Sequence, residues 1–153
     1  MAADCASRKR HLPELRSFVS KKPICAVHQG RHTLIRDTWN TDIVPELKPQ
    51  TGDVVIYRTR YSGFYQTNLD SILKKLVSKH LIITGCTTSV CVDSTIRDAM
   101  FRDYQPVLLA DCTAEPIGYG LPRSNHDASL LTVQVLLGWV SSSDDFIKAL
   151  GDS

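Results

Sequence analysis

One short segment has the composition and setting of a site for nucleophilic chemistry. Residues 85–91 read Gly-Cys-Thr-Thr-Ser-Val-Cys and follow an apolar run, Leu81–Thr84, that is typical of a buried strand. A helix is expected to begin within this segment, which places Cys91 in its first turn. The unpaired N–H groups and the positive dipole end of a helix stabilise a thiolate. They can also bind the oxyanion that forms when a thiolate attacks a carbonyl. The segment therefore predicts Cys91 as a nucleophile.

Packing is the alternative role for each cysteine, because cysteine is among the most buried residue types. Cys86 and Cys112 end expected strands and Cys25 lies within one, so we expect these three in the core. The odd count of 5 cysteines without a Cys-x-x-Cys pair predicts free thiols and a cytoplasmic location. A redox pairing of Cys86 with Cys91 is a weaker alternative.

Overall composition excludes several classes of protein. The 153 residues carry 18 basic and 16 acidic side chains, and a net charge of +2 gives no reason to expect nucleic acid or a membrane surface as a partner. No apolar run reaches the ~18 residues of a membrane span. The histidines are scattered and lack the spacing of metal ligands, so we expect neither a metal nor a cofactor. We expect one soluble domain over residues 1–153.

Strand-like and helix-like segments alternate along the chain, which predicts an α/β fold with a mostly parallel sheet. The expected strands are Pro23–Val27, Val54–Tyr57, Leu81–Thr84 and Val107–Ala110. Helices are expected over Leu69–Val77 with Thr67 as N-cap, from Thr88, over Asn125–Leu137, and over Ser143–Gly151 with Ser143 as cap. Before the first strand, Leu12, Leu15, Phe18 and Val19 form a helical stripe, although the basic residues 1–22 also allow an organelle leader. Residues 29–50 read as a long loop.

Ligands of open α/β sheets bind beyond the carboxyl ends of the strands. Three segments lie there: 28–30, 58–66 and 85–91. His28 either faces this pocket or is structural. Trp39 in the long loop is either a lid residue or docked on the body, and Trp139 is assigned to the core or to a subunit interface.

Motifs in several places resemble the isochorismatase-like cysteine hydrolases. Residues 84–99 match Thr-Gly-x-x-Thr-x-x-Cys-Val-x-x-Thr-x-Arg-x-Ala. Upstream, Gly52–Phe64 resembles the family's Asp-x-Val-x-x-Lys-x-Arg-Tyr-Ser-Gly-Phe segment, and downstream Asn125–Leu130 resembles its last core helix. The resemblance covers about residues 20–150 and implies a three-layer α/β/α sandwich.

The family's catalytic groups are Cys, Asp and Lys, and two of these positions have a counterpart. The resemblance implies Cys91 as nucleophile, backbone amides of Cys91 and Thr87 as the oxyanion site, and a cis peptide between Cys86 and Thr87. The lysine position holds Arg58, whose guanidinium stays protonated and stabilises negative charge without relaying protons. The family's acid lies on its first strand, no such segment is found here, and we expect the chain to start after that strand. We therefore assign the acid to no residue.

The implied function is hydrolysis of a C–N bond in a small amide of ureido or carbamoyl type through a Cys91 thioester. Residues 58–64 and 115–118 most resemble the ureidoacrylate and biuret branch of the family. The resemblance assigns substrate binding to Arg60, Tyr61, Phe64 and Thr88, with core packing as the alternative for the aromatic residues. We also expect a homo-oligomer. The competing interpretation, favoured by Arg58 and the unassigned acid, is a catalytically impaired binding or assembly subunit.

Overall fold

The computed structural model describes residues 18–21 and 38–151. The expected strand Pro23–Val27, His28, and the stripe residues Leu12 and Leu15 lie outside the described residues. Five strands are present: β1 (Phe18–Lys21), β2 (Val54–Tyr57), β3 (His80–Cys86), β4 (Gln105–Ala114) and β5 (Trp139–Ser141). The α-helices are α2 (Leu69–Lys75), α3 (Asp93–Met100), α4 (Asn125–Thr132) and α5 (Ser143–Gly151). Two segments are π-helical: η4 (Thr88–Val92) leads directly into α3, and η5 (Val133–Leu137) continues α4. Two short 3-10 turns lie at Trp39–Thr41 and Pro45–Leu47.

The described strands form two separate sheets, and every pairing in them is parallel. β1 pairs with β2 from Phe18 opposite Val54 to Lys21 opposite Tyr57, and the other sheet has the order β3-β4-β5. The expected α/β class is confirmed. The assignment of Phe18 and Val19 to a helical stripe is wrong, because these residues form backbone pairs with the β-branched strand β2.

The three-stranded sheet is more extended than the sequence predicts. The expected strands 81–84 and 107–110 are confirmed but continue to Cys86 and Ala114, with an irregular register between Ile83 and Gly85. β5 was not predicted, because three residues between two helices are too short for a periodic signal. Its pairing with β4 sets Val107 opposite Trp139.

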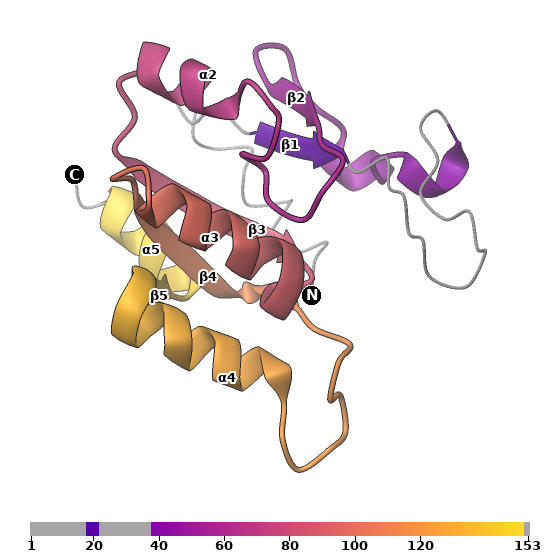
Figure 1. The fold of residues 1–153 in the computed structure, drawn as a ribbon, viewed down its shortest axis with the longest axis vertical. Coiled ribbons are helices and arrows are strands. Elements are labelled where there is room, and N and C mark those ends of the chain that lie inside the picture. Colours follow the sequence, from indigo (N-terminus) through magenta and orange to yellow (C-terminus); the bar gives the residue numbers. More distant parts are fainter. Residues whose placement is uncertain (1–17, 22–37, 152–153) are drawn as a thin grey trace.

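Helices cover both faces of the β3-β4-β5 sheet, with α3 and α4 on one face and α5 on the other (Figure 1). The main core lies under α3 and α4. It consists of the buried side chains of Val92, Ile96, Leu108, Val133 and Leu137. Ile96 and Leu108 have no exposed surface. This packing accounts for the helical spacing of apolar residues in both segments, since each helix directs one stripe at the sheet.

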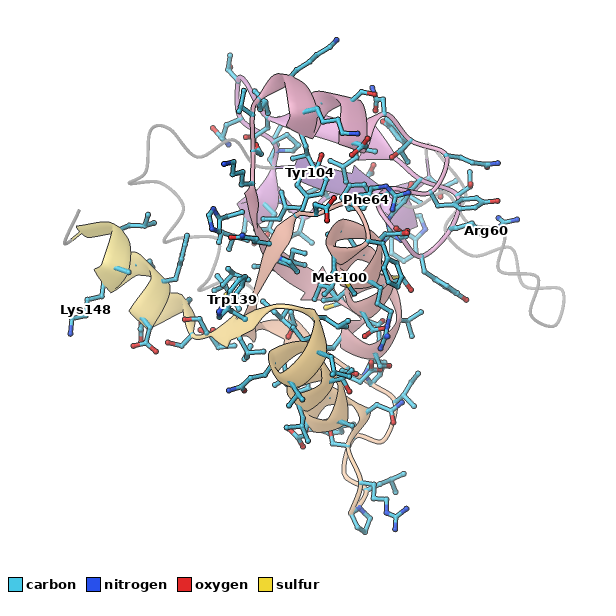
Figure 2. The ribbon with its side chains drawn as sticks, turned by 60° about the vertical axis from the view of Figure 1, so that its left-hand side comes forward. Arg60, Phe64, Met100, Tyr104, Trp139 and Lys148 are labelled. Carbon is cyan, nitrogen blue, oxygen red and sulfur yellow. The ribbon has the colours of Figure 1, made fainter. Side chains whose placement is uncertain are left out.

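A second core cluster holds α2 against the end of α3. Leu73, Phe64, Ala99 and Tyr104 are buried together, and Figure 2 shows Phe64 and Tyr104 side by side. The Tyr104 hydroxyl donates to Asp70 Oδ1 at 2.9 Å. The N-cap of α2 is Asn68 rather than the expected Thr67, but the Thr67 hydroxyl accepts the Leu69 N–H at 3.3 Å.

Several large apolar side chains remain exposed. Trp39 is 87% exposed, which contradicts the docked alternative, and Trp139 is 56% exposed, which removes it from the core.

Helix α5 begins at Ser143, but its N-cap is Ser142 rather than the expected Ser143, because the Ser142 hydroxyl accepts the Asp145 N–H at 3.0 Å. Within residues 18–21 and 38–151, no helix has the length and apolar character needed to cross a membrane.

Candidate active site

The turn that carries Cys91 connects the end of β3 to α3 and has an unusual backbone. Gly85 has φ +121°, a conformation in which any side chain is strained. The peptide bond between Cys86 and Thr87 is cis, as the family resemblance implies. The chain then enters η4, where the N–H groups of Val90 and Val92 donate to the Thr87 carbonyl at 3.2 and 3.1 Å. The expected helix start at Thr88 is confirmed.

Cys91 is partly buried in this first turn, and its thiol is free. Its carbonyl accepts the Thr95 hydroxyl at 2.7 Å. Two other expectations about cysteines are wrong. Cys86 is exposed rather than in the core, because it lies at the carboxyl end of β3 where the chain leaves the sheet. Cys112 is disulfide-bonded rather than a free thiol.

Two residues from distant segments hold the start of η4. One Glu115 oxygen accepts the Ser89 N–H at 2.7 Å and the other accepts the Ile117 N–H at 2.9 Å. The hydroxyl of Thr88, which is 1% exposed, lies 3.0 Å from His126 Nδ1. Thr88 is thus a buried partner of His126. The sequence did not single out either Glu115 or His126 as a residue of the site.

Hydrogen bonding keeps Glu115 ionised. Burial works to raise the pKa of this carboxyl, but donation from Ser89 and Ile117, with the nearby His126, outweighs burial and lowers the pKa below its usual value. A buried carboxylate of this kind is stable only where its donors are fixed. The Ser89 amide and the Glu115 carboxylate therefore constrain one another.

The segment after β2 is organised around Arg58. This side chain is 8% exposed, and its Nη1 donates to the carbonyls of Arg60 at 2.8 Å and Tyr61 at 2.5 Å. The residue in the family's lysine position thus holds the backbone of the following turn. Arg60 and Tyr61 are themselves exposed, and Figure 2 shows Arg60 pointing away from the body.

A threonine links this segment to the helix that carries Cys91. Thr95 Oγ1 accepts the N–H of buried Gly63 at 3.0 Å and donates to the Cys91 carbonyl at 2.7 Å. Phe64, by contrast, is 5% exposed and stacks on Tyr104 with ring centroids 5.8 Å apart. The Arg102 guanidinium also lies over the Phe64 ring, 5.0 Å from its centroid. The packing alternative accounts for Phe64.

A shallow, open groove of about 240 Å³ lies between α3 and α4. Its lining is mostly polar and comprises Ser89, Asp93, Arg97, Asn125, Ala128, Ser129 and Thr132. Cys91 does not line it. Among the described residues, no group of three or more His, Cys, Asp or Glu side chains is arranged to hold a metal ion.

Comparison with known proteins identifies the family. The model of the isochorismatase domain matches residues 8–145. This chain belongs to the isochorismatase domain family. Among solved structures, an isochorismatase-like hydrolase from Alkaliphilus metalliredigens superposes with a TM-score of 0.80 at 27% identity, over 94% of this chain and 78% of that one. The N-carbamoylsarcosine amidase from Thermoplasma acidophilum gives 0.76 at 26% identity, over 94% and 81% of the two chains.

The curated relatives include ureidoacrylate amidohydrolases. That of Variovorax paradoxus is 42% identical over 76% of this chain and 44% of its own length. That of Serratia proteamaculans is 43% identical over 76% of this chain and 46% of its own length. The isochorismatase-domain chain thus spans a little under half of these two relatives.

Proposed function

We propose that this isochorismatase-family chain hydrolyses a C–N bond in a small ureido or carbamoyl amide, with Cys91 as the nucleophile. The observation that carries the proposal is the free Cys91 thiol in the first helical turn after strand β3. The names of the relatives, ureidoacrylate amidohydrolase and N-carbamoylsarcosine amidase, support this class of substrate.

The reaction takes two steps. In the first, the Cys91 sulfur attacks the amide carbonyl carbon, and the backbone N–H groups of Thr87 and Cys91 stabilise the oxyanion. The C–N bond then breaks, and the nitrogen leaves as ammonia or an amine that carries the thiol proton. In the second step, water attacks the thioester, releases the acid and restores the thiol. Arg60 and Tyr61, which are exposed on the segment after β2, are proposed to contact the substrate.

The proposed role of Arg58 is electrostatic. Arginine is a poor proton carrier, and a general acid or base contributes ~10²–10⁴ in rate. We therefore expect slow turnover. The hydrogen bonds from Arg58 to the carbonyls of Arg60 and Tyr61 also favour the second candidate function, a catalytically impaired binding subunit, because they commit the guanidinium to the turn.

Ammonia release from ureidoacrylate and N-carbamoylsarcosine tests the proposal, with Cys91→Ala as the test variant and Cys86→Ala as the matched control. Both thiols are free and lie in the same turn. We expect Cys91→Ala to remove all turnover and Cys86→Ala to retain it. Turnover that survives in Cys91→Ala would refute the nucleophile.

Mass mapping with iodoacetamide adds an independent test, because the N–H groups at the start of a helix stabilise the thiolate, which is the form of the thiol that reacts. We expect Cys91 to react faster than Cys86 even though Cys86 is more exposed. If neither substrate is turned over by the wild type or by Arg58→Lys, the binding-subunit candidate replaces the hydrolase. Turnover that rises in Arg58→Lys supports the hydrolase.

We also propose that the chain forms a homo-oligomer. The outer face of α4 and η5 supports this, because Leu131, Val135 and Leu136 are 63%, 67% and 71% exposed. Neighbouring exposed apolar side chains commonly mark protein–protein interfaces. Light scattering after size exclusion should give a mass above 17.1 kDa, and a monomer at micromolar concentration would contradict the expectation.

A further inference from the structure

The nucleophile turn is tied to the end of β4 by a contact that nothing in the proposed chemistry requires. Glu115 is the first residue after β4 and is 8% exposed. Its two carboxylate oxygens accept one N–H each, from Ser89 at 2.7 Å and from Ile117 at 2.9 Å. Ser89 lies two residues after Thr87 and two before Cys91, midway between the two amides proposed to bind the oxyanion.

At this position the Glu115 carboxylate can fix the backbone conformation of the turn between β3 and α3. The N–H groups at the start of a helix have no acceptor within the helix, and an acidic side chain that accepts one of them fixes the local backbone. A charge-assisted hydrogen bond is about twice as strong as a neutral one. Since the lowered pKa of Glu115 keeps the carboxylate ionised, the bond to Ser89 is of this kind.

We infer that Glu115 is a positioning residue that holds the Thr87 and Cys91 amides in the orientation required to stabilise an oxyanion. The inference rests on the proposed function for its catalytic consequence. The geometric part, that Glu115 orders residues 86–92, is independent of any substrate. Oxyanion stabilisation depends on donor orientation, and the loss of one donor in a known hydrolase lowers kcat by ~10²–10³.

The test variants are Glu115→Ala, which removes both acceptors, and Glu115→Gln, which keeps one. Asp127→Asn is the matched control, because it removes an exposed carboxylate from the first turn of α4. Hydrogen exchange by mass spectrometry measures order directly. We expect the peptide covering 86–92 to exchange at least ~10-fold faster in Glu115→Ala, to a lesser degree in Glu115→Gln, and not in Asp127→Asn. The peptide covering α2 should be unchanged in all three.

Two thiol reagents separate positioning of the amides from access to the sulfur. Propionaldehyde forms a hemithioacetal, in which a new S–C bond forms and the carbonyl oxygen becomes an oxyanion that then takes the thiol proton. Iodoacetamide alkylates the same sulfur and forms no oxyanion. While the hemithioacetal is present, iodoacetamide cannot alkylate Cys91, so propionaldehyde protects this thiol. We expect Glu115→Ala to weaken that protection by ~10-fold or more. The rate of Cys91 alkylation by iodoacetamide without propionaldehyde should change by less than ~3-fold. In the amidase assay, kcat should fall and KM should stay within ~3-fold.

Exchange that is unchanged at 86–92, or that accelerates equally throughout the chain, would overturn the inference. The inference would also be overturned if propionaldehyde protection of Cys91 and its alkylation rate with iodoacetamide fell by the same factor. Such a result would indicate that the whole surroundings of the thiol had changed, and not only the orientation of the amides. If the wild type turns over neither amide but the local acceleration and the selective loss of propionaldehyde protection are seen, Glu115 positions the turn and only the proposed function fails. If Glu115→Ala does not fold, Glu115→Gln supplies the same comparison.

Discussion

Replacement of Thr95 by valine removes a hydroxyl that joins two parts of the candidate site. Thr95 Oγ1 accepts the Gly63 N–H at 3.0 Å and donates to the Cys91 carbonyl at 2.7 Å. Valine has the same shape and branching as threonine, and the two have similar helix propensities, so Thr95→Val leaves the volume and the helix intact. The principal change is that Gly63, which is buried, loses the acceptor of its N–H.

The magnitude follows from that one donor. A buried N–H without a partner costs ~1–3 kcal/mol, and for a chain of this length each kcal/mol lowers Tm by ~2–4 °C. We therefore expect Thr95→Val to lower the free energy of unfolding by roughly 1–3 kcal/mol. Urea unfolding followed by circular dichroism measures this, with thermal melting as a second reading.

Thr95→Ser is the matched control, because serine keeps the hydroxyl and loses only a methyl group. A fully buried methylene is worth ~0.8 kcal/mol, and Thr95 is half-buried, so Thr95→Ser should cost less than this. The reasoning is refuted if Thr95→Ser destabilises the chain as much as Thr95→Val does, or if Thr95→Val is neutral.

Two further predictions concern the helices that support the sheet. Asp111 accepts the Ser143 N–H at 2.8 Å and the Ser143 hydroxyl at 2.5 Å at the start of α5. Asp111→Ala should therefore lower the midpoint of urea unfolding by the equivalent of ~1–2 kcal/mol. An unchanged midpoint would contradict this. Burial and the hydrogen bond to Asp70 raise the pKa of Tyr104 to about 12. Because an unfolded tyrosine ionises near pH ~10, the protonated native form loses stability as pH rises from about 10 through 12. Tyr104→Phe should unfold with a shallower dependence on pH in that range, measured by fluorescence, and an identical dependence would show that Tyr104 does not contribute.

The sequence predicts best those elements whose signal is local. The helical spacing of Leu69, Leu73 and Leu76 depends on residues within one or two turns, and α2 and α4 begin at Leu69 and Asn125, where the sequence predicts them. β5 and the strand at Phe18–Lys21 depend instead on pairing with β4 and β2. Phe18 and Val19 fit a helical stripe equally well when the partner strand is unknown.

In the candidate site too, features set by one local motif are predictable from the sequence, and features set by contacts elsewhere in the fold are not. Cys91, the cis peptide before Thr87 and the helix start at Thr88 follow from one continuous motif. The aromatic Phe64 has the right spacing for a pocket, but stacking on Tyr104 accounts for its position. Arg58 was predicted by alignment with the family's lysine, whereas its hydrogen bonds to the carbonyls of Arg60 and Tyr61 depend on how the turn closes.

Three of the contacts around the turn that carries Cys91 span long distances in sequence. Ser89 and Glu115 are 26 residues apart, Gly63 and Thr95 are 32 apart, and Thr88 and His126 are 38 apart. No periodic pattern links such pairs, so one sequence can indicate a nucleophile without indicating what orients it. Orientation of the donors, however, decides how far an oxyanion is stabilised. If the turn is catalytic, its rate depends on residues such as Glu115 and Thr95 as well as on Cys91, and variants of all three should lower kcat while leaving the fold of β3 and α3 in place.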